Sequence, residues 1–367
     1  MPFISRPIIK KYFFILLFVL AWVLVSSGKI YNSMSYFTAD DSNIEYIGRF
    51  YFSRPGIARF DWPGVQIRTN FSGTFCAIKI KDGHNDYNIL IDGKLTEVLR
   101  TSSDTIYTIA ENLKDSLHSL IITKRTEGDN SISSFEGFIL NKTDSLYPFV
   151  NKKKRKIEFI GDSFVAGLGS EGKTPDCLFS RDTDNNYIAF GPVLARRFNA
   201  DYSIIAHSGI GVVRNDGDTN LTSERPLPYY YKRSCLNDTL KWDFQKWQPD
   251  LVVVRLGNND YWKKPYPLTK VFQEAYFNFL KEIRNLYPQA SILVFCEPIG
   301  KDQHCDYISS AVTELKNEFG DKKIWFEKLN IILDKQKDFG CKQHPNGSGH
   351  KKIADALEPI IRKAMNW

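Results

Sequence analysis

Apolar and polar side chains alternate in short segments between residues 45 and 147, which is the pattern of strands that bury one face. The clearest segments are 65–68, 77–80, 88–93 and 120–123, and the turn pair Asp92-Gly93 ends one of them. A long run with helical periodicity is not visible in this region. Short strands at this spacing predict a small all-β domain built as a sandwich.

The pattern changes at residue 156. Near-continuous apolar runs occupy 157–160, 202–205, 251–254 and 291–295, which is typical of parallel strands buried on both faces. Helical patterns lie between these runs, and the clearest one places these apolar residues on one face: Val271, Phe272, Ala275, Tyr276, Phe279, Leu280 and Ile283. Alternating strands and helices predict a doubly wound α/β sheet over 156–367, with its ligand crevice at the carboxyl ends of the strands.

The first 30 residues have the features of an export signal. Arg6, Lys10 and Lys11 precede an apolar run at 12–25, and the small residues Ser26-Ser27-Gly28 follow it. The run is close to the shortest length that spans a bilayer, so an uncleaved membrane anchor is the alternative. In both cases we expect the rest of the chain to be exported, as a periplasmic, secreted or outward-facing anchored protein.

The composition is that of a globular protein and gives no sign of nucleic-acid binding. The chain has 43% hydrophobic and 25% charged residues and a formal net charge of +7, which is ordinary for a globular protein. The densest basic run, 152–156, precedes a predicted strand and is expected to be a solvated linker, so we predict no nucleic-acid partner.

The cysteines permit disulfides in an exported protein, but their irregular spacing does not fix the pairing: Cys76, Cys177, Cys235, Cys296, Cys305 and Cys341. Cys296 lies in an apolar run and is expected to be a small core residue. We see no cluster of convergent ligands and therefore predict no metal and no cofactor.

Chemically suggestive residues follow the predicted parallel strands. Gly161-Asp162-Ser163 follows the first of these strands, and His344-Pro345-Asn346 lies in a loop ahead of the last helical stretch. Each run alone is an ordinary turn, but one crevice would bring them together. We therefore predict Ser163 as a nucleophile and His344 as its general base, and we assign His350 no role.

Two further loops could stabilise an oxyanion. Ser208-Gly209-Ile210-Gly211 follows the second of these strands, and Gly257-Asn258-Asn259-Asp260 follows the third. The backbone N–H groups of Ser163 and Gly211 and the side chain of Asn259 are the predicted donors, with Gly209 as the alternative to Gly211. Asp260 and Arg214 are expected to fix the loops.

These runs resemble, in order, the four sequence blocks of the SGNH (GDSL) hydrolases. The segments 187–197, 208–215 and 341–346 resemble carbohydrate esterase family two, and 60–64 with 71–74 resemble its small N-terminal domain. The resemblance implies a jelly-roll domain at 45–147, followed by a flavodoxin-like SGNH hydrolase domain at 156–367. It also implies a serine esterase that removes O-acetyl groups from xylan- or mannan-type polysaccharide without a cofactor.

The chain departs from the family pattern beside the histidine. Cys341 stands where SGNH enzymes commonly carry an aspartate, and Lys342 and Gln343 replace an aspartate and a tryptophan. A backbone carbonyl at 341–342 or the carboxylate of Asp338 would therefore orient His344. If the carbonyl does so, replacing Cys341 or Asp338 is expected to cost little activity.

Other readings of the function stay open. The substrate could be a peptidoglycan acetyl group, a lipid ester or a thioester, and a non-catalytic carbohydrate-binding protein is an alternative from another class. Aromatic side chains at 229–231 and at Tyr261-Trp262 suit either sugar stacking or the core. The serine does not lie in a Gly-x-Ser-x-Gly sequence, which disfavours the ordinary α/β-hydrolase fold.

Overall fold

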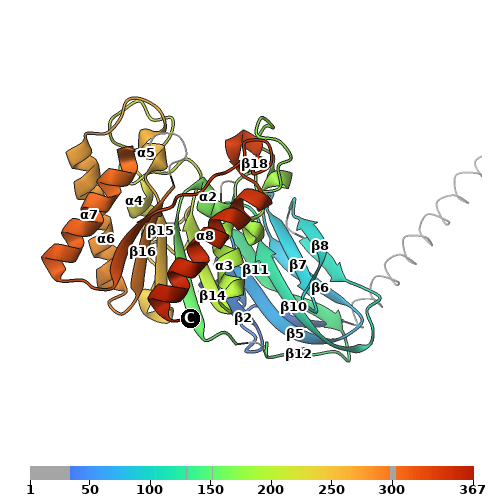
Figure 1. Ribbon diagram of the computed structural model, residues 1–367. Coiled ribbons are helices and arrows are strands. Elements are labelled where there is room, and N and C mark those ends of the chain that lie inside the picture. The colour runs from blue at the N-terminus through green and yellow to red at the C-terminus, as the bar shows by residue number, and fades with distance from the viewer. Residues whose placement is uncertain (1–33, 104, 129–130, 151, 298–302) are drawn as a thin grey trace, which may run out of the picture.

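The computed structural model describes residues 34–367 except 104, 129–130, 151 and 298–302. The predicted export signal or anchor at residues 1–30 lies outside the described residues. Across the described part of the chain, no helix is both long and apolar enough to cross a membrane. Figure 1 shows a β-sandwich, coloured blue to green, beside an α/β unit that continues to the red C-terminus.

The N-terminal domain consists of two antiparallel sheets. One has the strand order β3-β4-β11-β6-β9 with β1 paired to β11, and the other has the order β12-β5-β10-β7-β8 with β2 paired to β5. The bounds are β1 Met34–Thr38, β2 Glu45–Ile47, β3 Tyr51–Arg54, β4 Ile57–Phe60, β5 Gln66–Gly73, β6 Cys76–Lys81, β7 Asp86–Ile91, β8 Lys94–Arg100, β9 Thr105–Ala110, β10 Ser116–Lys124, β11 Ser133–Asn141 and β12 Leu146–Tyr147. The sandwich thus begins before residue 45, the boundary expected from the sequence.

The predicted alternation of side chains builds the core of this domain. On β10, Leu120 and Ile122 lie opposite Ile91 and Ile89 of β7, and all four are buried. They join one hydrophobic cluster with residues of the facing sheet, such as Phe135. Because successive side chains of a strand point to opposite faces, alternate apolar residues suffice to fill the space between two sheets.

The C-terminal domain is built on a parallel sheet with the strand order β14-β13-β15-β16-β17. Its bounds are β13 Arg155–Gly161, β14 Ala200–Ala206, β15 Leu251–Arg255, β16 Ser291–Cys296 and β17 Ile324–Lys328. The four predicted runs fall within β13 to β16. The sequence analysis missed β17, an edge strand that is only partly buried and carries Glu327 and Lys328, so it lacks an apolar run.

Helices cover both faces of this sheet, as Figure 1 shows. Phe159 and Val253 face one cluster with α3 (Phe190–Arg197) and α8 (Gly347–Met365). Val252 and Val254 face the opposite cluster with α6 (Thr269–Leu286) and α7 (Gln303–Phe319). The predicted apolar face of α6 is buried at Phe272, Tyr276, Phe279, Leu280 and Ile283, whereas Val271 is exposed. The doubly wound fold is thereby confirmed.

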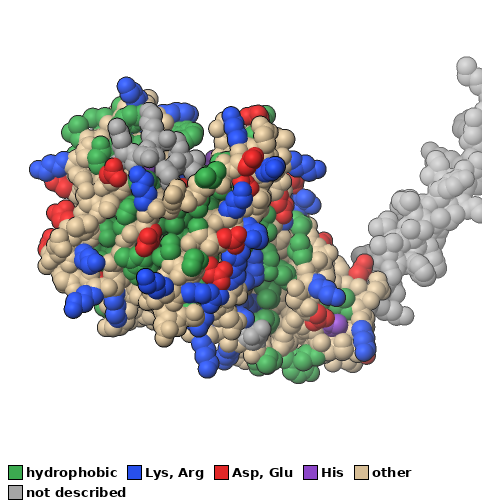
Figure 2. Space-filling view, viewed as in Figure 1, with side chains coloured by type: hydrophobic (Ala, Val, Ile, Leu, Met, Phe, Trp, Pro, Cys, Tyr) green, Lys and Arg blue, Asp and Glu red, His purple; other side chains and the backbone are tan. Residues whose placement is uncertain are grey.

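Short elements occupy the loops at the rim of the sheet. They are α2 Ser163–Ala166, α4 Leu227–Tyr231, α5 Asn258–Trp262, the antiparallel pair β18 Phe339–Gly340 and β19 His344–Pro345, and 3-10 turns at Arg181–Thr183, Asn186–Ile188, Phe244–Lys246 and Cys341–Gln343. Of the basic run 152–156, residues 155–156 open β13 instead of belonging to a linker. Figure 2 shows Lys and Arg side chains lying among Asp and Glu side chains on the visible face.

Buried polar contacts join the two domains. Arg49 of the sandwich lies 3.4 Å from Glu158 on β13, and both side chains are 1% exposed. Arg68 on β5 lies 2.7 Å from Asp201 on β14. A buried ion pair that loses one partner costs roughly 3–5 kcal/mol, so these pairs favour one arrangement of the two domains over others.

Candidate active site

Ser163 is the first residue of α2, directly after β13, as the sequence predicts. Asp162 caps this helix, and its carboxylate accepts the N–H of Phe164 at 3.1 Å. Asp162 therefore fixes the turn that presents the Ser163 side chain at the carboxyl edge of the sheet.

Arg255, the last residue of β15, holds Asp162 in place. Its Nη1 lies 2.5 and 2.6 Å from the two carboxylate oxygens, and its Nε donates to Glu297 at 2.8 Å. The guanidinium also lies 4.0 Å from the centre of the Phe164 ring. These residues are buried, so the cation and both carboxylates depend on one another. The sequence analysis did not single out Arg255, although a charged residue ending a buried strand requires a partner.

His344 contacts Ser163 directly. Its Nε2 lies 2.8 Å from Ser163 Oγ, and its Nδ1 lies 2.9 Å from the carbonyl oxygen of Lys342. A carbonyl only accepts, so Nδ1 carries the proton and Nε2 of the neutral ring accepts from the serine hydroxyl. Burial lowers the pKa of His344 below its ordinary value, although the Lys342 carbonyl and the Asp162 charge partly oppose this shift. The ring is therefore neutral at neutral pH, as a base must be.

The turn that carries the Lys342 carbonyl is tightly anchored. Lys342 and Gln343 both have left-handed backbone angles, φ 52° and 57°, which cost roughly 1–2 kcal/mol per residue. Cys341 forms a disulfide with Cys177, and the N–H of Lys342 donates to the Cys177 carbonyl at 3.0 Å. Gly169 permits this approach, since a Cβ there would lie 2.7 Å from the Cys341 carbonyl oxygen. Cys341 is therefore a disulfide-bonded residue that anchors this turn, not a neutral thiol beside the histidine.

Asp338, the alternative orienting group, is engaged elsewhere. Its carboxylate accepts from the backbone N–H of Asp334 at 2.7 Å and from Ser348 Oγ at 2.7 Å, and it pairs with Lys352 at 2.5 Å. Ser348 and Lys352 belong to α8, whereas the two His344 ring nitrogens are bonded to Ser163 and Lys342. Of the two candidates, the geometry brings the backbone carbonyl to His344.

The oxyanion loop after β14 requires one correction. The N–H of Gly211, our predicted donor, is taken by the side chain of Asn215 at 3.1 Å. Gly209, the alternative, instead lines the cavity beside Ser163 and has φ 74°. Asn259 also lines the cavity, and one hydrogen of its amide donates to the Ile210 carbonyl at 2.8 Å. The structure thus brings Ser163, Gly209, Asn259 and His344 to one cavity.

Asp260 and Arg214 hold this loop, as predicted. The buried carboxylate of Asp260 accepts the N–H groups of Val212, Val213 and Arg214 at 2.8 to 3.0 Å. Burial raises the pKa of Asp260 to about 6, against the effect of these three donors. The Arg214 side chain donates to the carbonyls of Asn220 and Lys263 at 3.1 and 2.9 Å.

The cavity has a volume of about 790 Å³. Trp262, which is 48% exposed, lines it together with Lys263, Lys335 and Lys342. Of the other aromatic side chains we singled out, Tyr231 and Tyr261 belong to the core, and Tyr229 packs against Arg233. His350 is buried and accepts the Phe190 N–H at 3.3 Å, and burial lowers its pKa to about 3.

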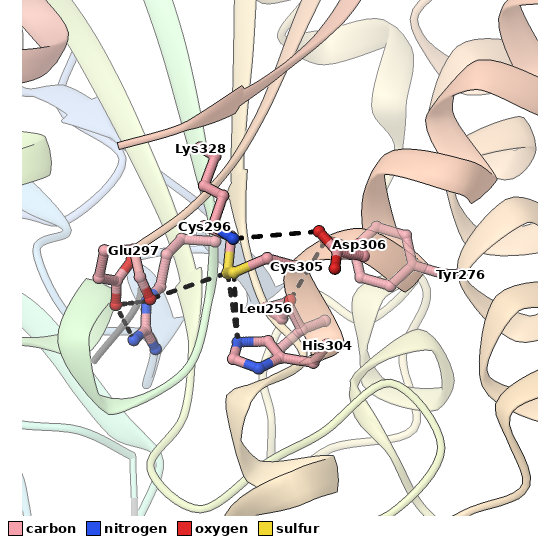
Figure 3. The surroundings of a disulfide bond; sticks show 9 residues. Leu256, Tyr276, Cys296, Glu297, His304, Cys305, Asp306 and Lys328 are labelled. Atoms are coloured by element: carbon pink, nitrogen blue, oxygen red, sulfur yellow. Dashed lines mark hydrogen bonds and ion pairs between the residues drawn. A yellow bond between two sulfur atoms is a disulfide. The ribbon is translucent and has the colours of Figure 1, made fainter. Parts of the chain in front are cut away.

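Figure 3 shows a second disulfide near this rim, between Cys296 and Cys305. Cys296 is a buried core residue as predicted, and the structure adds that it is disulfide-bonded. Together with His304, whose Nε2 lies 3.2 Å from the Cys296 sulfur, the two cysteines form a group with metal-ligand chemistry that the sequence analysis missed. In the structure the two sulfurs form a disulfide with each other, and a disulfide sulfur is not the thiolate ligand that zinc requires.

Comparisons with known proteins agree with this architecture. Residues 46–149 match the model of the carbohydrate esterase 2 N-terminal domain, and residues 159–352 match the GDSL-like lipase/acylhydrolase family. The cellulase/esterase CelE of Acetivibrio thermocellus is 32% identical over 335 residues, 89% of this chain, but the chain spans only 40% of its length. An acetylxylan esterase / glucomannan deacetylase of Cellvibrio japonicus is 28% identical over 320 residues, 83% of this chain and 85% of that protein.

Solved structures show the same arrangement of domains. A family two carbohydrate esterase from Clostridium thermocellum in complex with cellohexaose has a TM-score of 0.83 at 29% identity, covering 88% of this chain and 99% of its own. A family two esterase from Cellvibrio japonicus, 21% identical with a TM-score of 0.80, covers 91% of this chain and 99% of its own and shares the fold. The resemblance found in the sequence is confirmed: the chain belongs to the GDSL-like lipase/acylhydrolase family, in the two-domain form of the family two carbohydrate esterases.

Proposed function

We propose that this protein is a serine esterase that removes O-acetyl groups from polysaccharide through an acyl-enzyme on Ser163. The contact of 2.8 Å between Ser163 Oγ and His344 Nε2 carries this proposal, because it joins a nucleophile to a neutral base at the edge of a cavity. The Lys342 carbonyl sets the tautomer that leaves Nε2 free to accept the proton.

The reaction follows from these positions. Ser163 Oγ attacks the ester carbonyl carbon while its proton moves to His344 Nε2, and the carbonyl oxygen takes the negative charge. The N–H groups of Ser163 and Gly209 and the second amide hydrogen of Asn259 stabilise that oxyanion. The bond to the sugar oxygen then breaks, and His344 returns the proton to this leaving group.

Water completes the cycle. His344 takes a proton from the water as its oxygen attacks the acyl carbon of the acyl-enzyme. The bond to Ser163 Oγ breaks, the serine is reprotonated, and acetic acid leaves. No cofactor enters these steps.

The substrate that we propose is an acetylated polysaccharide of the xylan or mannan type. Relatives named acetylxylan esterase and glucomannan deacetylase, and one solved with cellohexaose, support this substrate class. The exposed face of Trp262 at the cavity offers a surface on which a sugar ring stacks. We also propose that the protein acts outside the cytoplasm, which the apolar run at 12–25 and the paired cysteines support.

Acetate release from acetylated xylan, acetylated mannan and O-acetylated peptidoglycan tests the proposal, with an activated acetyl ester as a general probe. We expect release from xylan or mannan and its loss in Ser163→Ala, whose thermal unfolding should match the parent. Strong chelators should leave the rate unchanged. Release from none of these substrates and no hydrolysis of the activated ester would favour the carbohydrate-binding alternative. Full activity of a folded Ser163→Ala would remove this serine from the reaction.

A further inference from the structure

The loop at 207–214, which carries the proposed oxyanion donor Gly209, is held at both ends by buried carboxylates from different domains. At its far end Asp260 of α5 accepts the N–H groups of residues 212–214. At its near end the carboxylate comes from Glu127, which follows β10 in the N-terminal sandwich.

Glu127 makes three contacts with the start of the loop. One carboxylate oxygen accepts the N–H of Ser208 at 2.5 Å and lies 2.9 Å from Nδ1 of His207, and the other accepts the Ser208 hydroxyl. The Glu127 side chain is 2% exposed, so water does not substitute for these donors. Both hydrogen-bond donors of Ser208, its N–H and its hydroxyl, thus contact one residue of the other domain.

The charge of Glu127 is retained in this buried position. Burial alone would raise the pKa of its carboxyl, but the hydrogen bonds and charge of His207 and the donors of Ser208 outweigh burial and hold the pKa below its ordinary value. The ammonium of Lys124 fixes the backbone at Glu127, because it donates to the carbonyl oxygens of Thr126 and Glu127 at 2.6 and 2.8 Å. An ionised acceptor makes shorter and stronger hydrogen bonds than a neutral one.

The segment held by Glu127 runs into the active site. Ser208 and Gly209 line the same cavity as Ser163 and His344. The N–H of His207 donates to the carbonyl of Gly161, two residues before the nucleophile, at 3.4 Å. Glu127 holds Ser208 by its N–H and its hydroxyl, and the peptide that follows Ser208 carries the N–H of Gly209.

We propose that Glu127 of the N-terminal domain is a positioning residue of the active site: it holds Ser208 so that the Gly209 N–H faces the developing oxyanion. This inference rests on the proposed esterase function. It gives the sandwich domain a part in the rate of the reaction, through one carboxylate, in addition to any part in binding polysaccharide.

Steady-state hydrolysis of 4-nitrophenyl acetate by the full chain tests this role. Glu127→Gln keeps the size of the side chain but turns an amide N–H₂ toward one of the two Ser208 donors. We expect kcat to fall about 10- to 100-fold, since a small displacement of a catalytic donor has an effect of this size, while KM changes less than about twofold. Ser208→Ala, which removes only the hydroxyl contact, should give a smaller fall in kcat.

Asp61→Asn is the matched control. Asp61 is also a buried carboxylate of the sandwich that accepts two backbone N–H groups of the other domain, those of Leu236 and Asn237 at 2.8 and 2.9 Å, and neither of these donors belongs to the loop at 207–214. It should lower the melting temperature about as much as Glu127→Gln and leave kcat unchanged. Parental kcat in a folded Glu127→Gln, or in Ser208→Ala if Glu127→Gln does not fold, overturns the inference. An inactive parent chain would instead overturn the proposed function, and the inference with it.

Discussion

Nδ1 of His344 lies 2.9 Å from the carbonyl oxygen of Lys342, two residues earlier in the chain. This contact does what an aspartate does in a three-residue triad: it fixes the tautomer and the orientation of the ring. A carbonyl adds no full negative charge, so it stabilises the imidazolium less than a carboxylate does. The geometry is therefore that of a Ser163–His344 dyad oriented by the main chain.

Asp338→Asn should separate the dyad from a triad. Because the Asp338 carboxylate is bonded to Ser348, Lys352 and the Asp334 N–H, we expect a small change in kcat and a loss of stability of about 1–3 kcal/mol. The same change costs about 10⁴ in kcat where an aspartate orients the histidine. Kinetics and urea unfolding measure both effects, and a loss of that size in a folded variant would rule out the dyad.

Cys177→Ser should weaken catalysis, although Cys177 lies outside the dyad. Its disulfide with Cys341 closes a separation of 164 residues and anchors the turn that carries the Lys342 carbonyl. We expect a stability loss of roughly 2–5 kcal/mol and a fall in kcat, because the carbonyl is freer to leave His344. Cys235→Ser, at a buried free cysteine, is the control and should keep the parental kcat. Parental kcat in Cys177→Ser at a temperature where it is folded would contradict the prediction.

The sequence was sufficient for the parts of the structure that depend on local pattern. Apolar runs located β13 to β16, and the polar loops that follow β13 and β15 located Ser163 and Asn259, whereas His344 was located by its loop ahead of the last helix. Parallel strands end at the same edge of a sheet, so local order along the chain becomes proximity in space.

The parts that failed depend on pairing between distant segments. The loop that carries Gly209 is held by Glu127, which lies in the other domain, so the choice between Gly209 and Gly211 as donor could not be made from the loop sequence alone. The cysteine partners were equally hidden, because Cys177 and Cys341 are 164 residues apart and their spacing carries no signal. A buried charge at the end of a strand, such as Arg255, does signal that a partner exists, but not which one.

Arg255→Met should be among the most destabilising single changes at this site. It removes the cation between Asp162 and Glu297 and leaves both carboxylates buried without it, which costs about 3–5 kcal/mol. Arg255→Lys should rescue little, since an ammonium cannot reproduce the forked contacts of the guanidinium. Urea unfolding measures the loss of stability.

Arg197→Met is the control, because Arg197 is a partly exposed cation that pairs with Asp355 and Glu358, and its loss should cost about 1 kcal/mol or less. Equal losses in the two methionine variants would contradict this prediction.

Asn259→Ala should lower kcat by about 10²–10³ and leave KM nearly unchanged, since the developing charge exists mainly in the transition state. The side chain also donates to the Ile210 carbonyl, so the substitution removes a hydrogen bond that holds the loop carrying Gly209. Asn259→Asp is the matched variant: it keeps the shape, replaces the donor with an acceptor and should be at least as impaired. A sharp rise in KM at constant kcat would make Asn259 a substrate-binding residue.

The pH dependence of kcat/KM should report the environment of His344. The base must be neutral to accept the Ser163 proton, so activity should rise with pH as His344 loses its own proton and then level off. Burial lowers the pKa of His344 from its ordinary value of 6.5, with the Lys342 carbonyl and the Asp162 charge opposing the shift in part. The acidic limb of the profile should therefore have its midpoint below pH 6.5.

Asp338→Asn should leave that midpoint in place, because Asp338 makes no hydrogen bond to the ring nitrogens of His344. A midpoint at or above 6.5 in the parent would mean that a negative charge acts on His344 more strongly than burial does, which favours a carboxylate partner over the main-chain carbonyl.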